Sequence, residues 1–269
     1  MSRVILITGA SSGIGRATAE RLAQRGYTVF GTSRHPEQHT ITRFTLLPLD
    51  VCDDESVQAC IQDVMKQAGR IDVLVNNAGY GLSGAIEEAS VDEAKALFET
   101  LFFGVLRVTN AVLPIMREQR AGQIINISSL AGILGVPYIG LYSAAKHALE
   151  GYSESLRYEV KQFGIHVAIV EPGDINTPLV MQSPAQPIPA YDGIRERVNS
   201  LHEANVRNGP SPEWVARKVT TLVERQPARF RHPLGLESWA LLAKRFLPER
   251  LGEGLMRLYY RMDAPLSQD

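Results

Sequence analysis

Apolar runs and amphipathic stretches alternate along the chain up to about residue 175. Short apolar runs are typical of strands that are buried on both faces of a parallel sheet. Stretches with apolar residues at helical spacing follow them and indicate amphipathic helices. We expect strands at 4–7, 27–30, 44–49, 71–75, 123–127 and 165–170, and helices at 14–25, 54–68, 91–120 and 142–163. The alternation predicts an α/β fold with a single Rossmann-type, doubly wound parallel sheet and helices on both faces.

The pattern breaks between Asn176 and Pro210, where Pro, Ser and Gln are frequent. A long irregular segment in a compact domain is usually functional. This one follows the carboxyl end of a strand, where open α/β sheets bind ligands. We therefore predict that residues 176–210 form a substrate lid. A helix is expected to start again at Ser211, because Ser followed by Pro is typical of a helix N-terminus.

The last segment, residues 236–262, predicts a C-terminal helical extension in two pieces that meet near Pro248. Its apolar side chains fall on two faces with basic residues between them: Trp239, Leu242 and Phe246 on one, Leu251, Leu255 and Leu258 on the other. The segment either packs against the domain or another subunit, or covers an apolar substrate or touches a membrane surface. Because there is no repeat or linker, residues 1–269 are expected to form one domain.

Composition narrows the class of protein. The 269 residues are 45% hydrophobic and 21% charged, with a formal net charge of -1, which is ordinary for a folded soluble chain and gives no basic surface for nucleic acid. The N-terminus has no signal-peptide pattern, and no apolar run is long enough to span a membrane. Cys52 and Cys60 are interpreted as free thiols, and the histidines lack metal-ligand spacing. A cytoplasmic protein without a metal site is the expectation.

A glycine-rich turn joins the first strand to the first helix. Glycines here let the backbone turn sharply and approach a pyrophosphate, which the helix N-terminus then favours. The spacing differs from the usual G-x-G-x-x-G, so the strand-turn-helix setting carries the prediction. The residues predicted to hold a dinucleotide are Gly9, Ser11, Ser12, Gly13, Ile14 and Gly15.

The end of the second strand indicates which dinucleotide binds. An NAD site places a carboxylate there for the ribose 2′-hydroxyl. Here the chain has Ser33 and Arg34 and no acid, and an arginine can pair with a 2′-phosphate. We favour NADP(H) over NAD(H).

Three side chains are suited to carbonyl chemistry. Tyr142 and Lys146 are four residues apart and therefore share a helix face, and Ser129 closes the fifth strand 13 residues before Tyr142. A tyrosine can exchange a proton with the substrate oxygen if a neighbouring cation stabilises its phenolate. Lys146 supplies that charge, and Ser129 can hydrogen-bond the same oxygen.

Several motifs occur in one order: TGASSGIG (8–15), LDV (49–51), NNAG (76–79), ISS (127–129), YSAAK (142–146) and PGDINTP (172–178). With this ordered set the chain resembles the short-chain dehydrogenase/reductase family, in particular its hydroxysteroid and retinol dehydrogenase-like members. The resemblance implies that Tyr142 is the general acid or base and Lys146 its partner, which also holds the nicotinamide ribose. It implies cofactor contacts for Asp50, Val51, Asn76, Ala78, Gly79, Pro172, Gly173, Ile175 and Thr177, and a homodimer or homotetramer.

One position departs from the family pattern. The family usually has an asparagine in the long central helix, where it helps to hold a water chain for proton relay, and this chain has Leu101. Leucine has no polar group to offer. The departure concerns the proton path and leaves hydride transfer itself unaffected.

The leading hypothesis is an NADP(H)-dependent alcohol dehydrogenase or carbonyl reductase that acts on a small-molecule, hydrophobic carbonyl or alcohol: steroid-, retinoid- or long-chain-like. One alternative is a 3-oxoacyl thioester reductase, for which Arg195, Arg197 and Arg207 near the lid would meet an acidic carrier. Another is a regulator that senses NADP(H) without turnover. The sequence leaves these two alternatives open.

Overall fold

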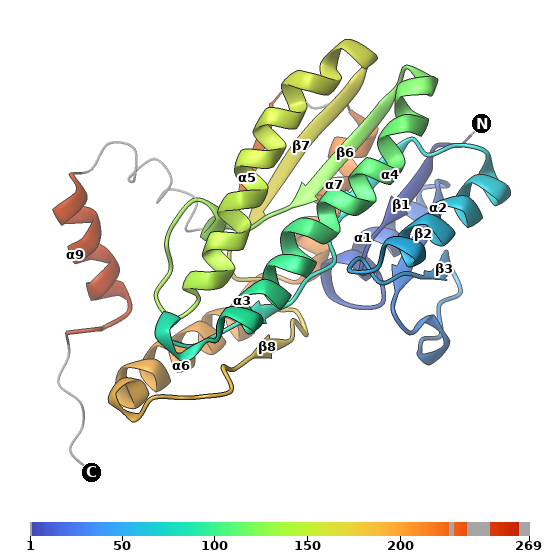
Figure 1. The fold of residues 1–269 in the computed structure, drawn as a ribbon. Coiled ribbons are helices and arrows are strands. Elements are labelled where there is room, and N and C mark those ends of the chain that lie inside the picture. Colours follow the sequence, from blue (N-terminus) through green and yellow to red (C-terminus); the bar gives the residue numbers. More distant parts are fainter. Residues whose placement is uncertain (1, 226–228, 236–247, 264–269) are drawn as a thin grey trace.

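The computed structural model describes residues 2–225, 229–235 and 248–263. Its main sheet has seven parallel strands in the order β3-β2-β1-β4-β6-β7-β9, which confirms the doubly wound α/β prediction (Figure 1). The order reverses between β1 and β4, the crevice where open sheets of this kind bind dinucleotides. The strands are β1 (Val4–Ile7), β2 (Thr28–Ser33), β3 (Thr45–Pro48), β4 (Val73–Asn76), β6 (Gly122–Ile127), β7 (Ile165–Pro172) and β9 (Arg231–Leu234).

Side chains of β1 alternate between the two faces of the sheet, and each face has its own apolar core. Leu6 packs under α2 (Asp54–Ala68), α4 (Gly104–Gln119) and α5 (Gly140–Val160). Ile7 packs under the helices on the other face, α1 (Gly13–Gln24) and α7 (Pro212–Glu224). Burial on both faces explains why these strands read as continuous apolar runs.

The predicted helix at 91–120 is present, with a change of winding inside it. α3 (Val91–Phe98) passes through a π-helical turn, Glu99–Phe103, into α4. By length and composition the stretch Val91–Gln119 is apolar enough to cross a membrane. In the fold its apolar face, including Leu97, Val108 and Met116, is buried against the sheet and its neighbours, as in the core helix of a globular domain.

The segment 176–210 differs from the irregular lid that the sequence predicts. It contains a short strand, β8 (Met181–Gln182), paired in parallel with β5 (Gly81–Leu82), and a helix, α6 (Asp192–Asn208). The prolines that suggested an irregular lid all precede α6, where they cannot interrupt its hydrogen bonds. Residues 176–191 remain mostly irregular, so the prediction is wrong for the second half of the segment.

The edge strand β9 was not predicted. Its sequence is polar and contains Pro233, which a sheet tolerates at its edge because one side of the strand needs no ladder bonds. In the C-terminal extension, α9 (Glu249–Tyr259) is present as the second predicted piece. The first piece, with Trp239, Leu242 and Phe246, lies outside the described residues.

Candidate active site

A cavity of about 2080 Å³ lies at the carboxyl ends of the central strands. One half is formed by the turns after β1, β2, β4 and β7, and the other by the segment after β7, α6 and α9. Ser129, Tyr142 and Lys146 line the region where the halves meet, so the sequence-predicted chemical and nucleotide sites share one cavity.

The glycine turn has the backbone that a phosphate site needs. Gly9 and Gly13 have φ of 66° and 54°, a left-handed conformation that other residues rarely adopt. A Cβ on Gly9 would lie 2.8 Å from the Cα of Ala78, so the turn packs directly against the end of β4. Ser12 precedes α1 in an extended conformation without capping the helix through its side chain, which leaves first-turn N–H groups for an anion.

Most of the predicted cofactor residues line the cavity, and two do not. Gly15 lies behind the turn, where a Cβ would be 2.2 Å from the Gly9 carbonyl oxygen. Asn76 is buried, and its Nδ2 donates to Thr109 Oγ1 (3.1 Å) and Asn126 Oδ1 (2.8 Å). The structure thus gives Asn76 a place in the core and not the predicted place along the cofactor.

Asn77, which the sequence interpretation missed, stabilises the glycine turn through hydrogen bonds to its backbone. Its Nδ2 donates to the carbonyl oxygens of Thr8 and Gly9, both at 3.0 Å, and it lines the cavity. The NNAG motif contains both asparagines, and only the direction of each side chain separates their roles. No periodicity rule identifies that direction at the end of a strand.

Arg34 lies at the mouth of the nucleotide half. It follows β2, is exposed and lines the cavity together with Ser33. Asp50 and Val51, after β3, line the adjoining wall. A guanidinium therefore lies in the cavity wall directly after β2.

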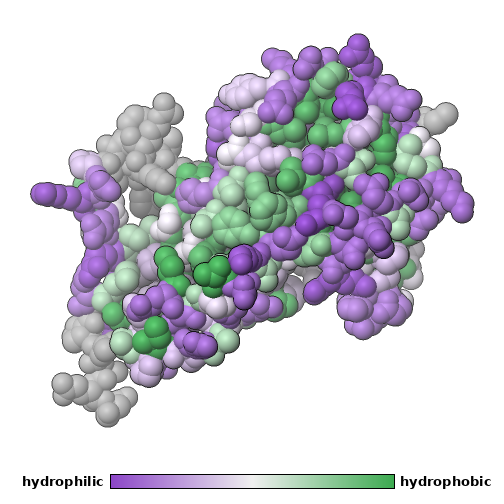
Figure 2. All heavy atoms as spheres, viewed as in Figure 1, coloured by the Kyte–Doolittle hydropathy of each residue, from purple (hydrophilic) through white to green (hydrophobic). Residues whose placement is uncertain are grey.

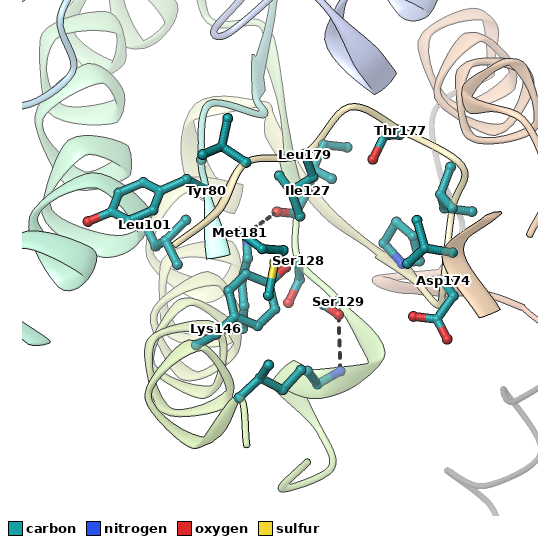
Figure 3. A pocket seen from close by; sticks show the side chains of 18 of the residues that line it. Tyr80, Leu101, Ile127, Ser128, Ser129, Lys146, Asp174, Thr177, Leu179 and Met181 are labelled. Carbon is teal, nitrogen blue, oxygen red and sulfur yellow. Dashed lines mark hydrogen bonds between the residues drawn. The ribbon is translucent and has the colours of Figure 1, made fainter. Parts of the chain in front are cut away.

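β6 and α5 bring the chemical groups together; Figure 3 shows two of them, Ser129 and Lys146. Ser129 follows β6, and its Oγ accepts a hydrogen bond from the Ala131 amide (3.1 Å). Lys146 lies one turn after Tyr142 on α5; its Nζ donates to the Ile127 carbonyl oxygen (2.9 Å) and is 5.7 Å from the Tyr142 ring centroid. Strand and helix thereby fix all three groups on rigid elements.

Burial dominates the protonation of these groups. It raises the pKa of Tyr142 to about 12, against a lowering by the hydrogen bond with Ser129, and the charge of Asp174 raises it further. Burial lowers the pKa of Lys146 to about 8, and the Glu150 carboxylate opposes that change. A proton donor is therefore held in its protonated form beside a lysine that titrates more readily than usual.

Behind Lys146 lies a buried cluster of acids. Glu150 is one turn further along α5, and Glu171 on β7 has no exposed side-chain surface. Arg231 from β9 bridges both, at 3.0 Å from the Glu171 carboxylate. Burial raises the pKa of both carboxyls, to about 7 for Glu171. The unpredicted edge strand thus supplies the cation that compensates these buried carboxylates.

Leu101 lies in the π-helical turn and is 1% exposed. It lines the cavity and packs with Leu97, Ala145 and Tyr142. A Cβ on Gly79 would be 2.7 Å from its Cδ2. The apolar side chain of Leu101 therefore lies beside Tyr142, at the position where the family usually has an asparagine.

The second half of the cavity is mostly apolar. Its walls come from the loop after β6, the segment after β7, and helices α6 and α9, and include Leu134, Val136, Leu179, Val206, Leu255 and Met256. Asn205 of α6 donates to the Tyr259 hydroxyl of α9 (2.8 Å), and Arg197 donates to the Arg261 carbonyl oxygen (2.8 Å). These bonds hold α9 over the open side of the cavity.

Helix α6 is also anchored on the side away from α9. The carboxylate of Glu88 is buried and pairs with Arg195, and it accepts the Ile188 amide (2.8 Å). Tyr191 donates to Glu87 (2.6 Å). Arg195 is thus occupied by an internal ion pair. In the described part of the chain, no group of His, Cys, Asp and Glu side chains is arranged to hold a metal ion.

The family model for short chain dehydrogenases matches residues 3–187. The chain belongs to the short-chain dehydrogenase family. It is 40% identical over 264 residues to a 3-ketodihydrosphingosine reductase of Bacteroides thetaiotaomicron, covering 96% of this chain and 98% of that protein. It is 42% identical over 188 residues to human retinol dehydrogenase 8, covering 65% of this chain and 60% of that protein. The predicted likeness to retinol dehydrogenase-like members is confirmed.

Solved structures of the family superpose closely. A short-chain dehydrogenase from Streptomyces avermitilis has a TM-score of 0.81 at 36% identity, covering 98% of this chain and 99% of the other. A Burkholderia phymatum relative in complex with NAD has a TM-score of 0.79 at 26% identity, with coverage of 94% and 95%. ElxO, solved with NADP bound, has a TM-score of 0.73 at 27% identity, with coverage of 89% and 100%. The family binds a nicotinamide cofactor, and these two structures contain NAD and NADP respectively.

Proposed function

We propose that this member of the family is an NADP(H)-dependent alcohol dehydrogenase or carbonyl reductase that acts on a bulky apolar substrate. One observation carries the proposal: Ser129, Tyr142 and Lys146 lie where a dinucleotide-type crevice opens into an apolar chamber. A nicotinamide in the crevice and a carbonyl group in the chamber would then lie next to each other, with the carbonyl oxygen at the Tyr142 hydroxyl.

The residues divide the chemistry between them. A bound nicotinamide supplies or accepts the hydride. Tyr142 donates the proton to the carbonyl oxygen in reduction and takes it back in oxidation, and Ser129 orients that oxygen. Lys146 stabilises the phenolate that forms, since its ammonium is held by the Ile127 carbonyl at the tyrosine ring.

The preference for NADP(H) rests on Arg34. Ser33 ends β2 and Arg34 follows it, and both line the cavity. β2 carries no carboxylate that could bind a ribose 2′-hydroxyl. Guanidinium groups bind phosphate through directed, charge-assisted hydrogen bonds. NAD(H) is the second choice.

The substrate proposal is a long-chain ketone of the 3-ketodihydrosphingosine type. The apolar chamber between α6 and α9 fits an aliphatic chain better than a small polar carbonyl. The relative that reduces 3-ketodihydrosphingosine matches this chain over nearly its full length, including α6 and α9, whereas the match to retinol dehydrogenase 8 covers 65% of the chain. Steroid and retinoid carbonyls are the next candidates.

We also propose a homodimer or homotetramer in the cytoplasm. Figure 2 shows apolar side chains gathered over the face that α4 and α5 form. Phe103, directly before α4, is 41% exposed. An exposed apolar patch of this kind is suited to a subunit contact. Cys52 and Cys60 are both free thiols, as in a reducing compartment.

The direct experiment follows NADPH and NADH oxidation by the purified protein with 3-ketodihydrosphingosine, steroid ketones, retinal and a 3-oxoacyl thioester. We expect turnover with NADPH and the long-chain ketone. Tyr142→Phe keeps the ring and removes the proton donor, so we expect kcat to fall about 1000-fold with NADPH affinity unchanged. NADPH binding without turnover on any carbonyl would favour the regulator alternative, and turnover on the thioester alone would favour the acyl alternative.

The thioester alternative has less support than the sequence alone suggested. It requires basic residues near the lid that are available to an acidic carrier, and Arg195 instead compensates buried Glu88. Arg207 still lines the cavity, so the thioester belongs in the panel.

A further inference from the structure

Helix α5 carries a row of titratable side chains that begins at the reacting centre. They stand at every fourth position of the helix, so each neighbouring pair shares a helix face: Tyr142, Lys146, Glu150 and Glu154. We call them the α5 row. The first two line the cavity, Glu150 is 5% exposed behind them, and the side chain of Glu154 is 50% exposed. The α5 row therefore runs from the cavity through the core to the surface.

The edge strand β9 lies at the outer end of the α5 row. Its Arg231 pairs with Glu150 and lies 3.3 Å from the Glu154 carboxylate. The same guanidinium lies 3.0 Å from the carboxylate of Glu171, on β7. The side chain of Arg231 is 39% exposed, because β9 forms the edge of the sheet. Water therefore has access to the end of the α5 row at Glu154.

Polar groups also surround the inner end. Lys146 donates one of its three ammonium protons to the Ile127 carbonyl oxygen and keeps the others for exchange. The next residue, Ser128, lines the cavity, and its hydroxyl lies beside Glu150: a Cβ on Gly132 would be 2.7 Å from Ser128 Oγ and 3.2 Å from Glu150 Oε1. Lys146 and Glu150 have separate partners in the described structure, so this hydroxyl or a water molecule has to carry a proton between them.

The proton path that is usual in the family is altered on the other side of Tyr142. Leu101 lies there in place of the usual asparagine, and leucine cannot hold water for a relay. Each reduction takes one proton from Tyr142, which solvent has to replace before the next turnover. A path along α5 leads away from Leu101 and needs no asparagine.

We propose that Glu150 relays protons between Lys146 and solvent along the α5 row, in place of the path that the family asparagine supports. The inference rests on the proposed function and adds a residue to its proton path. Glu150 does not touch the substrate and acts through Lys146, so it is a positioning residue for the transferred proton.

The relay balances proton by proton. In reduction, Tyr142 gives its hydroxyl proton to the carbonyl oxygen and becomes a phenolate. The Lys146 ammonium group protonates the phenolate, and Glu150 in its acid form protonates the Lys146 amine. Water at the Glu154 end then returns a proton to the Glu150 carboxylate. Only O–H and N–H bonds break and form in these steps, and solvent supplies one proton for each carbonyl that is reduced. Oxidation runs the same steps in reverse.

The electrostatics of the α5 row favour this exchange. Burial lowers the pKa of Lys146 to about 8 and raises that of Glu150, so the two pKa values are closer together than in water. Proton transfer between two groups costs less free energy when their pKa values are closer. The Ser128 hydroxyl, Arg231 and Lys146 oppose the rise at Glu150, and Glu171 faces the same arginine with a pKa of about 7.

The test follows NADPH oxidation with whichever of 3-ketodihydrosphingosine, the steroid ketones and retinal the wild type reduces fastest. In Glu150→Gln we expect kcat to fall about tenfold with NADPH affinity unchanged, because the amide keeps the shape of the side chain and cannot carry the proton. Adding Leu101→Asn to this variant should restore kcat to within about threefold of the wild type, because the asparagine supports the other path. A loss caused by disturbed packing around Glu150 would not be restored by a change on another helix.

Glu171→Gln is the matched control. Glu171 is a buried acid that contacts the same arginine, undergoes the same change to an amide and lies outside the α5 row. We expect its kcat to stay within about twofold of the wild type. The solvent deuterium isotope effect on kcat should rise in Glu150→Gln and keep its wild-type value in Glu171→Gln, since only the first change makes proton delivery limiting.

Fluorescence titration with NADPH checks that each variant folds. If Glu150→Gln does not bind NADPH, Glu150→Asp takes its place, because it keeps the charge and withdraws the carboxyl group from Lys146. We expect kcat to fall about threefold in Glu150→Asp and to be restored by Leu101→Asn in the same way.

The outcomes separate the relay from the proposed function. A wild type that reduces no carbonyl of the panel would overturn the proposed function and this inference with it. An active wild type whose kcat is unchanged in Glu150→Gln would overturn the relay alone. Equal losses in Glu150→Gln and Glu171→Gln, or a loss that Leu101→Asn does not restore, would also overturn the relay, since Glu150 would then have a structural role.

Discussion

The two halves of the cavity are built in different ways. The nucleotide half consists of backbone: the left-handed glycines of the first turn, the free N-terminus of α1 and the hydrogen bonds from Asn77. The substrate half consists of side chains from segments far apart in the chain, held by side-chain hydrogen bonds such as that of Asn205 with Tyr259. A backbone site tolerates little change and serves one cofactor class, whereas a side-chain site can be altered residue by residue.

The buried acids Glu150 and Glu171 lie behind Lys146, outside the cavity wall, and should dominate the pH dependence of stability. The folded-state pKa of Glu171, about 7, is above its ordinary value of 4.5. Its contribution to stability is thus fully present below about pH 4.5 and lost as the pH rises to about 7. In Glu171→Gln the fall in unfolding free energy between pH 5 and 7.5 should shrink by about 2 kcal/mol.

Urea unfolding at both pH values measures this difference. Glu20→Gln, a surface acid of α1 paired with Arg16, is the control and should keep the wild-type slope. An unchanged pH dependence in Glu171→Gln would show that Arg231 keeps Glu171 ionised throughout this range.

Arg34→Ala tests the nucleotide half, because our proposal assigns the charge of Arg34 to the 2′-phosphate of NADP(H). We expect NADPH affinity to fall about tenfold and NADH affinity to change less than about twofold, because only NADPH carries the 2′-phosphate. Titration of both cofactors by fluorescence measures the ratio. Equal losses for both would remove the argument for NADP(H).

Leu101→Asn tests the boundary between the halves. The amide would lie beside Tyr142, where it can help to hold water for proton relay, so we expect turnover to rise about threefold. Cofactor affinity should stay within about twofold. Steady-state kinetics and NADPH titration give the two numbers. A large loss of cofactor affinity would place Leu101 in the nucleotide half instead.

Tyr259→Phe should have the smallest effect and should be confined to the substrate half. It removes the hydroxyl that Asn205 contacts and keeps the ring, so α9 is held less firmly over the cavity. We expect KM for a long-chain ketone to rise about threefold, in line with the loss of one hydrogen bond, and KM for a short aldehyde to stay the same. An equal rise for both substrates would contradict a covering role for α9.

Local patterns were enough to predict the elements of the central sheet and the glycine turn, because strand burial and helix spacing leave their periods in the sequence. The pair Tyr142 and Lys146 was predictable for the same reason, since one helical turn fixes their common face. The lid was harder. α6 has few apolar residues and follows a proline-rich stretch, so its amphipathic period was hidden, and β9 is too short and polar to resemble a strand.

The sequence by itself determined the fold class and the family, and it was enough to propose Ser129, Tyr142 and Lys146 as the chemical groups, since each of these depends on motifs of residues that are close along the chain. Only the tertiary structure decided that Asn76 belongs to the core and Asn77 to the turn, that Arg231 compensates two buried acids, and that Asp174 meets His202. Those contacts join residues that are distant in sequence or differ only in side-chain direction. Packing sets both, and no local period records them.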